Sequence, residues 1–283
     1  FAGLKYGICD GNSSWYCTGF WTGFGEQYGM HCWLLSGHGT VNLITGITNS
    51  CDIVFYEIGK GFFYNNDHPE GMQETFRAFG LGALSGIDLP EEASGRVPDA
   101  EWKWNYFTSS PDDARKWQGG DNCNLAIGQG DLLVTCLQMA NAYCGIANRG
   151  PIYKPHVLKS INARNGNGSV IEYKNEVILS PEEKDEHRDI VARGLYGVVY
   201  EESASQTIHW TNLDVTVNGK TGTAEQQSIG EPVGWFVGYA PADKPQYVVA
   251  ANLDCAPSGA GSGMYIVRDV FGAIYNQPDN VGR

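Results

Sequence analysis

Three short extended segments near the carboxyl terminus constrain the fold more than any other feature. Residues 215–223, 235–239 and 246–253 are rich in β-branched and aromatic side chains and are separated by short polar turns. Connections of this length favour antiparallel neighbours, so we expect a three-stranded meander. A helix expected over residues 263–275 would pack back onto this sheet.

The remainder of the chain predicts helices joined by glycine-rich turns. The spacing of apolar residues predicts helices over 53–59, 70–82, 131–147 and from Ser180 to about Val199, with Asn49 or Ser50 capping the first and Gly59 ending it. Residues 85–122 have a loop-like composition, and residues 152–178 predict strand pieces around a turn at 165–168. Residues 1–48 predict the start of a helix, then short strands or loops.

Together these elements predict an α/β fold of the α+β type, with an antiparallel sheet flanked by helices and an all-helical lobe beside it. We expect one domain over residues 1–283. Residues 1–150 would form the mostly helical lobe with its loops, and residues 151–283 the sheet lobe.

Charge and hydropathy exclude several classes of protein. The formal net charge of −13 argues against a nucleic-acid partner, because such proteins carry basic patches. No run of about 18 apolar residues is present, so no segment is expected to span a membrane. The chain begins at Phe1, from which we expect a fragment whose targeting segment lies upstream.

The first strand of the meander carries the residues best suited to acyl-transfer chemistry. Lys220 supplies a positive field, and the hydroxyls of Thr221 and Thr223 can hold a substrate carboxylate. Gly222 has no side chain, so a ligand or another strand can come close. An extended substrate could pair with the strand edge through main-chain hydrogen bonds. The simpler alternative is a turn-to-strand segment with a solvated lysine.

A second candidate site lies at the expected start of the 53–59 helix. Ser50 at a helix start, close to a lysine, can relay a proton between a nucleophile and a leaving amine. Alternatively, Ser50 only caps the helix. Asp52 follows two residues later, and an ionised carboxylate there can only accept a hydrogen bond.

These segments, in this order, resemble the transpeptidase domain of class B high-molecular-weight penicillin-binding proteins, the elongation-type branch in particular. The resemblance covers nearly the whole chain. It rests on S-G-H-G-T-V-N-L at 36–43, S-C-D at 50–52, F-G-L-G at 79–82, G-I-D-L-P-E-E at 86–92, G-R-V-P at 95–98, A-I-G-Q-G at 126–130, I-A-N-R-G at 146–150 and K-T-G-T-A-E at 220–225. In the family's S-x-N motif the third residue is Asn, where this chain has Asp52.

The resemblance implies a peptidoglycan D,D-transpeptidase that cross-links stem peptides through a serine acyl-enzyme and is a target of β-lactams. Ser50 and Asp52 would belong to its second motif, and Lys220, Thr221 and Thr223 would bind the terminal carboxylate. The backbone N–H of Thr223 would be one oxyanion donor. The S-x-x-K motif that holds the nucleophile occurs nowhere in these residues, so we expect it upstream and expect the chain alone to be inactive.

The resemblance also implies a setting and partners. The domain would lie on the extracytoplasmic face of a bacterial membrane, anchored by an upstream segment, beside a membrane glycan polymerase. Two rival functions share the fold or the site: a serine β-lactamase or β-lactam sensor, and a module that binds stem peptides or partner proteins without chemistry. A β-lactamase needs a base for the deacylating water, and no obvious glutamate loop supplies one.

The cysteines leave three interpretations open. Among the eight cysteines, Cys17 and Cys32 flank a loop rich in glycine and aromatic residues, with His31 and His38 nearby. The interpretation we favour is a disulfide between Cys17 and Cys32, which would stabilise the fold by roughly 3 kcal/mol. Free thiols come second. Zinc held by these Cys and His residues with an Asp comes third; some elongation-type relatives bind zinc in this region. We predict no other cofactor.

Overall fold

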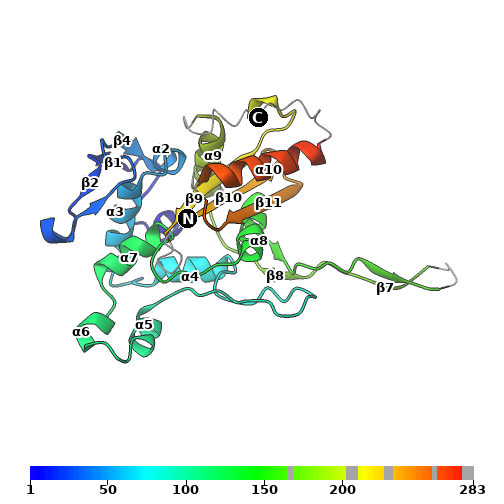
Figure 1. The fold of residues 1–283 in the computed structure, drawn as a ribbon, viewed down its shortest axis with the longest axis horizontal. Helices are drawn as coiled ribbons and strands as arrows, with labels where there is room; N and C mark the ends of the chain where they lie inside the picture. The colour runs from blue at the N-terminus through cyan, green and yellow to red at the C-terminus, as the bar shows by residue number, and fades with distance from the viewer. Residues whose placement is uncertain (165–167, 202–209, 226–231, 257–259, 276–283) are drawn as a thin grey trace.

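The computed structural model describes most of the chain as two lobes built around helices and small antiparallel sheets (Figure 1). The described residues are 1–164, 168–201, 210–225, 232–256 and 260–275. The predicted turn at 165–168 lies mostly outside these residues.

The sheet lobe contains the predicted meander. Strands β9 (Asn218–Ala224), β10 (Val233–Ala240) and β11 (Tyr247–Leu253) pair antiparallel in the order β11-β10-β9, which leaves β9 at an edge. Helix α10 (Ala260–Ile274) packs on the sheet, as predicted.

The two faces of β10 pack against different helices because side chains alternate along a strand. Phe236 is fully buried in a cluster with Val267 and Phe271 of α10. Val237 and Tyr239 lie in a cluster with residues of α8 (Cys136–Ala147) and α9 (Asp185–Tyr200). The sheet is therefore covered on both faces, and its β9 edge is available to the rest of the molecule.

The amino-terminal lobe is mostly helical, and the short strands predicted within residues 1–48 are present in it, so the lobe is not all-helical. Its helices are α1 (Ala2–Lys5), α2 (Leu43–Thr48), α3 (Asp52–Phe63), α4 (Gly71–Ala78), α5 (Ala100–Tyr106), α6 (Asp112–Arg115) and α7 (Gly119–Ala126). It also holds two small antiparallel sheets, β1 (Ser14–Cys17) with β4 (Gly39–Asn42), and β2 (Phe20–Trp21) with β3 (Met30–His31), and the single turn η1 (Glu26–Tyr28).

The prediction that Gly59 ends α3 is wrong. The helix continues past Gly59 to Phe63, because this glycine serves packing rather than termination. A Cβ on Gly59 would lie 2.7 Å from the Asn122 carbonyl oxygen, so its absence lets α7 approach α3 closely. The α9 boundary also differs, since that helix begins at Asp185 rather than near Ser180.

The segment between the lobes forms one long antiparallel arm. Strand β5 (Ile152–Tyr153) pairs with β8 (Val177–Leu179), and β6 (Ser160–Asn162) pairs with β7 (Ser169–Glu172), which confirms the predicted strand pieces. The β6–β7 pair is nested between the strands β5 and β8. The β6–β7 part extends away from the body in Figure 1. In the described part of the chain, no helix combines the length and apolar character needed to cross a bilayer.

Candidate active site and metal cluster

Ser50 and Lys220, predicted from separate segments, meet in the structure. Lys220 Nζ donates a hydrogen bond to Ser50 Oγ over 2.5 Å, although 170 residues separate the two in the chain. The same ammonium group donates to the Thr221 carbonyl oxygen at 3.0 Å and to Thr221 Oγ1 at 3.2 Å. A cation and two hydroxyls therefore converge where the α2–α3 turn faces β9.

Helix packing places Ser50 beside β9. Helix α2 ends at Thr48, and it packs against α9 at Gly194 and Gly197. Thr48 Oγ1 donates to the Gly194 carbonyl oxygen at 3.3 Å, and a Cβ on Gly197 would lie 2.2 Å from Thr48 Oγ1. Because only glycine permits this approach, the α9 surface fixes how far Ser50 lies from the sheet lobe.

The conformation of Ser50 is itself unusual. Its φ angle is +52°, in the left-handed region where residues with a Cβ are uncommon. The chain reverses there between α2 and α3, and the Ser50 and Cys51 N–H groups donate to the carbonyl oxygens of Ile47 and Gly46. The predicted alternative, in which Ser50 caps α3, does not hold, because Cys51 occupies the N-cap position.

The other predicted residues of the K-T-G strand lie along the same edge. Thr223 is exposed and Thr221 is half-buried, while Gly222 stands opposite Trp235 of β10. A Cβ on Gly222 would lie 3.2 Å from the Trp235 Cβ. The Thr223 carbonyl points away from β10 and accepts a hydrogen bond from Gln129. The strand thus presents polar main-chain groups and hydroxyls on its open side.

The Asp52 carboxylate is held by the backbone of the segment that carries Trp33. Its Oδ2 accepts a hydrogen bond of 2.8 Å from the Trp33 backbone N–H. Burial raises the pKa of the Asp52 carboxyl to about 6; the Trp33 N–H and Lys220 oppose this shift, and the neighbouring Cys32 adds to it. Trp33 was not predicted as a site residue, yet its exposed indole donates from Nε1 to the Asn49 carbonyl oxygen beside Ser50.

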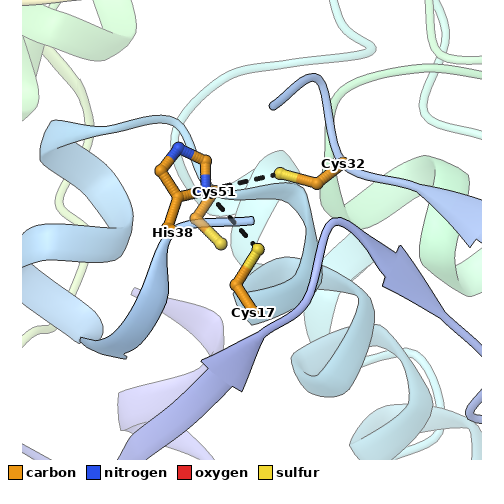
Figure 2. A group of neighbouring side chains, drawn as sticks. All are labelled: Cys17, Cys32, His38 and Cys51. Atoms are coloured by element: carbon orange, nitrogen blue, oxygen red, sulfur yellow. Dashed lines mark hydrogen bonds between the residues drawn. The ribbon is translucent and has the colours of Figure 1, made fainter. Parts of the chain in front are cut away.

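The predicted Cys17–Cys32 disulfide is absent from the structure, where both cysteines carry free thiols. Instead, Figure 2 shows Cys17, Cys32 and Cys51 converging on His38. Their ligand atoms all lie within 4.8 Å of one another, and the three cysteines are buried. The two cysteines of the predicted disulfide are thus members of a four-residue cluster. His31 belongs elsewhere, since its ring packs against Phe20 on the β2–β3 pair.

The donor set and spacing of this Cys3His cluster fit a tetrahedral zinc ion. His38 Nδ1 lies 3.5 Å from Cys17 Sγ and 3.6 Å from Cys32 Sγ. Ligands at the usual Zn–S and Zn–N lengths would be about 3.5 Å apart in a tetrahedron. His38 Nε2 is buried without a hydrogen-bond partner among the described residues. The polar contacts of the ring are therefore those of Nδ1 with the two sulfur atoms.

The surroundings of Cys32 favour its thiolate form over the neutral thiol. Cys51 and Cys32 share a hydrogen bond that lowers the pKa of the Cys32 thiol to about 4 and raises that of Cys51. Backbone N–H groups of Leu34 and Asp52 and the nearby His38 also favour the Cys32 thiolate. Thiolates are the ligands that zinc binds, and metal binding displaces the remaining thiol protons.

Comparison with known proteins gives a family match over most of the chain. Residues 1–276 match the family model described as "Penicillin binding protein transpeptidase domain". The chain is similar to two proteins named "Peptidoglycan D,D-transpeptidase MrdA": that of Acinetobacter baumannii is 30% identical over 95% of this chain and 40% of its own length, and that of Haemophilus influenzae 29% over 94% and 41%. The chain thus spans about two fifths of the length of these relatives.

Solved structures agree with the sequence comparison. Pseudomonas aeruginosa PBP2 in complex with WCK 5153 superposes with a TM-score of 0.80 at 26% identity, over 96% of this chain and 56% of that one. A structure titled "Structural coordination of polymerization and crosslinking by a peptidoglycan synthase complex" gives a TM-score of 0.79 at 25% identity, over all of this chain and 45% of the other. The overall arrangement of the two lobes is therefore shared.

Proposed function

This chain belongs to the penicillin-binding protein transpeptidase family, and on that premise we propose that it forms the acyl-donor site of a peptidoglycan D,D-transpeptidase. The observation that carries the proposal is the 2.5 Å hydrogen bond from Lys220 to Ser50 across the two lobes. A lysine alone on a strand has many roles, but a lysine held against a motif serine is the arrangement that proton relay requires.

Each residue has a defined part in the proposed reaction. Lys220, Thr221 and Thr223 bind the terminal carboxylate of a stem peptide that ends in D-Ala-D-Ala. The Thr223 backbone N–H donates to the carbonyl oxygen under attack, which stabilises the charge that develops there. Ser50 passes a proton to the leaving D-Ala amine, and Lys220 keeps the Ser50 hydroxyl oriented for this transfer. The attacking serine belongs to the S-x-x-K motif, which these 283 residues do not contain.

A non-covalent titration tests this proposal on the chain as it stands. We expect diacetyl-L-Lys-D-Ala-D-Ala to shift the NMR signals of residues 220–223, and Lys220→Ala to abolish the effect. Lys244→Ala is the matched control, because Lys244 is an exposed lysine on the β10–β11 turn. Equal binding by the Lys220→Ala variant would refute the anion site. Turnover of a chromogenic cephalosporin would favour the β-lactamase alternative instead.

The setting and the partners follow from the relatives. We propose that the domain works on the extracytoplasmic face of a bacterial membrane, held by sequence beyond these residues, beside a glycan polymerase. The similar structure whose title couples polymerization with crosslinking supports the polymerase. We also propose that the site binds β-lactams; the similar PBP2 solved in complex with WCK 5153 shows that a relative of this fold binds a small molecule. Co-purification with a glycan polymerase from the same organism tests the partner.

We propose in addition that Cys17, Cys32, His38 and Cys51 bind one structural zinc ion. The agreement between the His38–sulfur distances and a tetrahedron favours zinc over a disulfide. Bound there, zinc would neutralise the thiolates and join the ends of β1 and β3 to the start of α3. Since Cys51 directly follows Ser50, the cluster would also fix one side of the motif serine.

Metal analysis of the purified chain tests the zinc site. We expect one zinc per chain, and a large loss of zinc in Cys51→Ser. Cys255→Ser serves as the matched control, because Cys255 is exposed and lies outside the cluster. Full zinc content in Cys51→Ser, or a Cys17–Cys32 disulfide in the metal-bound protein, would overturn this assignment.

A further inference from the structure

The side-chain amide of Gln129 occupies main-chain groups on the open edge of β9. Gln129 Nε2 donates to the Thr223 carbonyl oxygen at 3.2 Å, and Gln129 Oε1 accepts from the Glu225 N–H at 3.3 Å. One planar amide therefore satisfies a carbonyl and an N–H two residues apart. These contacts join the amino-terminal lobe to the sheet lobe, since 94 and 96 residues separate the partners.

The loop that carries Gln129 is well defined. Gly128 and Gly130, on either side of Gln129, have φ angles of +76° and +72°. Glycine adopts such positive angles readily, and they form the tight turn after α7. The Gln129 N–H donates to the Asn124 carbonyl oxygen at 2.8 Å, tying the turn to the last residues of α7. The backbone therefore holds this side chain at the strand edge, and only its own χ angles need change to withdraw it.

The occupied groups are those that an extended peptide would use. In an antiparallel ladder, directly opposed residues of a hydrogen-bonded pair exchange both N–H···O bonds. If the Thr223 N–H holds the carbonyl of the penultimate D-Ala, then the N–H of that same D-Ala faces the Thr223 carbonyl oxygen. Gln129 Nε2 already donates to that oxygen in the free protein. The glutamine amide thus imitates the main chain of the acyl donor.

We propose that the Gln129 side chain competes with the substrate for the Thr223 carbonyl oxygen and is displaced by an acyl donor with a free penultimate N–H. This inference rests on the proposed transpeptidase function of the site. A ligand that cannot donate to the Thr223 carbonyl leaves the Gln129 contact in place, so only a ligand with the free N–H has to break it. The chemical class of ligand is an N-acyl-D-aminoacyl-D-amino acid bound in an extended conformation.

Two probes and two variants test the inference on the 283-residue chain. The probes are diacetyl-L-Lys-D-Ala-D-Ala and its analogue methylated at the penultimate D-Ala nitrogen. Gln129→Ala should bind the parent probe about fivefold more tightly, the factor that corresponds to one hydrogen bond of typical net strength. It should bind the methylated probe with unchanged affinity. Gln27→Ala, a variant of an exposed glutamine in η1, should change neither affinity.

Amide hydrogen exchange supplies a second measurement that does not depend on the probes. The Glu225 N–H, held by Gln129 in the free protein, should exchange several-fold faster in Gln129→Ala and at the wild-type rate in Gln27→Ala. Weaker or equal binding of the parent probe by Gln129→Ala overturns the inference, and so does unchanged Glu225 exchange.

The proposed function is judged by a separate comparison. If Lys220→Ala abolishes binding while Gln129→Ala binds no more tightly than wild type, the site stands and the displacement is wrong. If Lys220→Ala binds the parent probe as well as wild type does, the transpeptidase site itself is wrong. A failure of the wild type and of Gln129→Ala to bind the parent probe overturns both.

Discussion

Replacing Gly197 with alanine should disturb the Ser50–Lys220 contact more than it disturbs overall stability. The added Cβ would stand 2.2 Å from Thr48 Oγ1 and 2.9 Å from Thr48 Cγ2. Thr48 is only 5% exposed, so its side chain has little room to turn away. To restore ordinary contact at 3.4 Å, α2 must move by about 1.2 Å relative to α9. Ser50, two residues beyond Thr48, would move with it.

The expected free energies can be estimated from the two opposing effects. Overpacking a buried contact costs about 1–3 kcal/mol, while glycine to alanine within a helix gains up to about 1 kcal/mol. The net loss of unfolding free energy should therefore be about 0–2 kcal/mol. The hydrogen bond suffers more, since 1.2 Å added to its 2.5 Å length would leave Lys220 Nζ and Ser50 Oγ beyond hydrogen-bond distance.

Urea denaturation and probe binding measure the two effects separately. Gly120→Ala is the matched control, because a Cβ on this exposed α7 glycine would meet nothing within 4 Å. Both variants replace a helical glycine with alanine, so most of the difference between their unfolding free energies reports the overpacking term, about 1–3 kcal/mol. Adding Thr48→Ala should recover most of the loss in stability and in diacetyl-L-Lys-D-Ala-D-Ala binding.

Two results would refute this reasoning about α2 and α9. The first is a Gly197→Ala variant that is as stable as Gly120→Ala and binds the probe like wild type. The second is a Gly197→Ala/Thr48→Ala variant no better than Gly197→Ala alone, since the clash would then lie elsewhere.

Four further predictions concern the site and the cluster. Ser50→Ala should leave the fold intact, with a loss of unfolding free energy of about 1 kcal/mol or less in urea denaturation, because only one partly buried hydrogen bond is lost; a loss above about 3 kcal/mol would contradict a role confined to the site. Chelation should lower the melting temperature of the wild type but not of a Cys17→Ser/Cys51→Ser variant. Zinc affinity should fall between pH 8 and pH 5 as the thiols take up protons, and a pH-independent affinity would argue against thiolate ligands. Asp52 has a pKa raised from 3.8 to about 6, so folding favours its protonated form. The unfolding free energy of the zinc-free protein should therefore fall as the pH rises from about 4 through 6. Asp52→Asn should remove this pH dependence in urea denaturation, and an unchanged dependence would show that another group titrates. Finally, labelled penicillin should form no covalent adduct on these 283 residues, because they contain no S-x-x-K motif; an adduct detected by mass spectrometry would disprove this.

The local pattern of apolar residues and turns was sufficient to predict the three-stranded sheet but not all helices of the amino-terminal lobe. The meander was predictable because each strand is a short apolar run bounded by a polar turn. Helices α5 to α7 were missed because the segment 85–122, in which they lie or begin, is rich in Gly, Pro, Ser and Asp, although the Asp99 side chain accepts a hydrogen bond from the Trp102 N–H and caps α5. Propensity alone could not identify Gly59 as a packing contact, since its partner lies on another helix.

The site was predictable only in part, for a related reason. Resemblance to a family identified Ser50 and Lys220, whereas nothing local indicates that residues 170 positions apart will touch. The four-residue cluster was not predicted, because Cys51 was considered only as part of the serine motif and Cys17 and Cys32 were weighed without it. The signal that could have found it is a buried cysteine at the start of α3, within reach of three neighbouring Cys and His residues. Gln129 was quoted only as part of a motif.

The metal cluster has a consequence for how a correctly assembled molecule can be recognised. Its four residues come from a single stretch of chain between Cys17 and Cys51, so they can assemble while the rest is still unfolded. The Ser50–Lys220 contact needs the chain to reach residue 220 and both lobes to dock. If the cluster binds zinc as proposed, a preparation could hold its full complement of zinc and still lack the Ser50–Lys220 contact. Under the proposed zinc site, metal content alone would therefore not report whether the lobes have docked, and a test of correct assembly must monitor the Ser50–Lys220 contact.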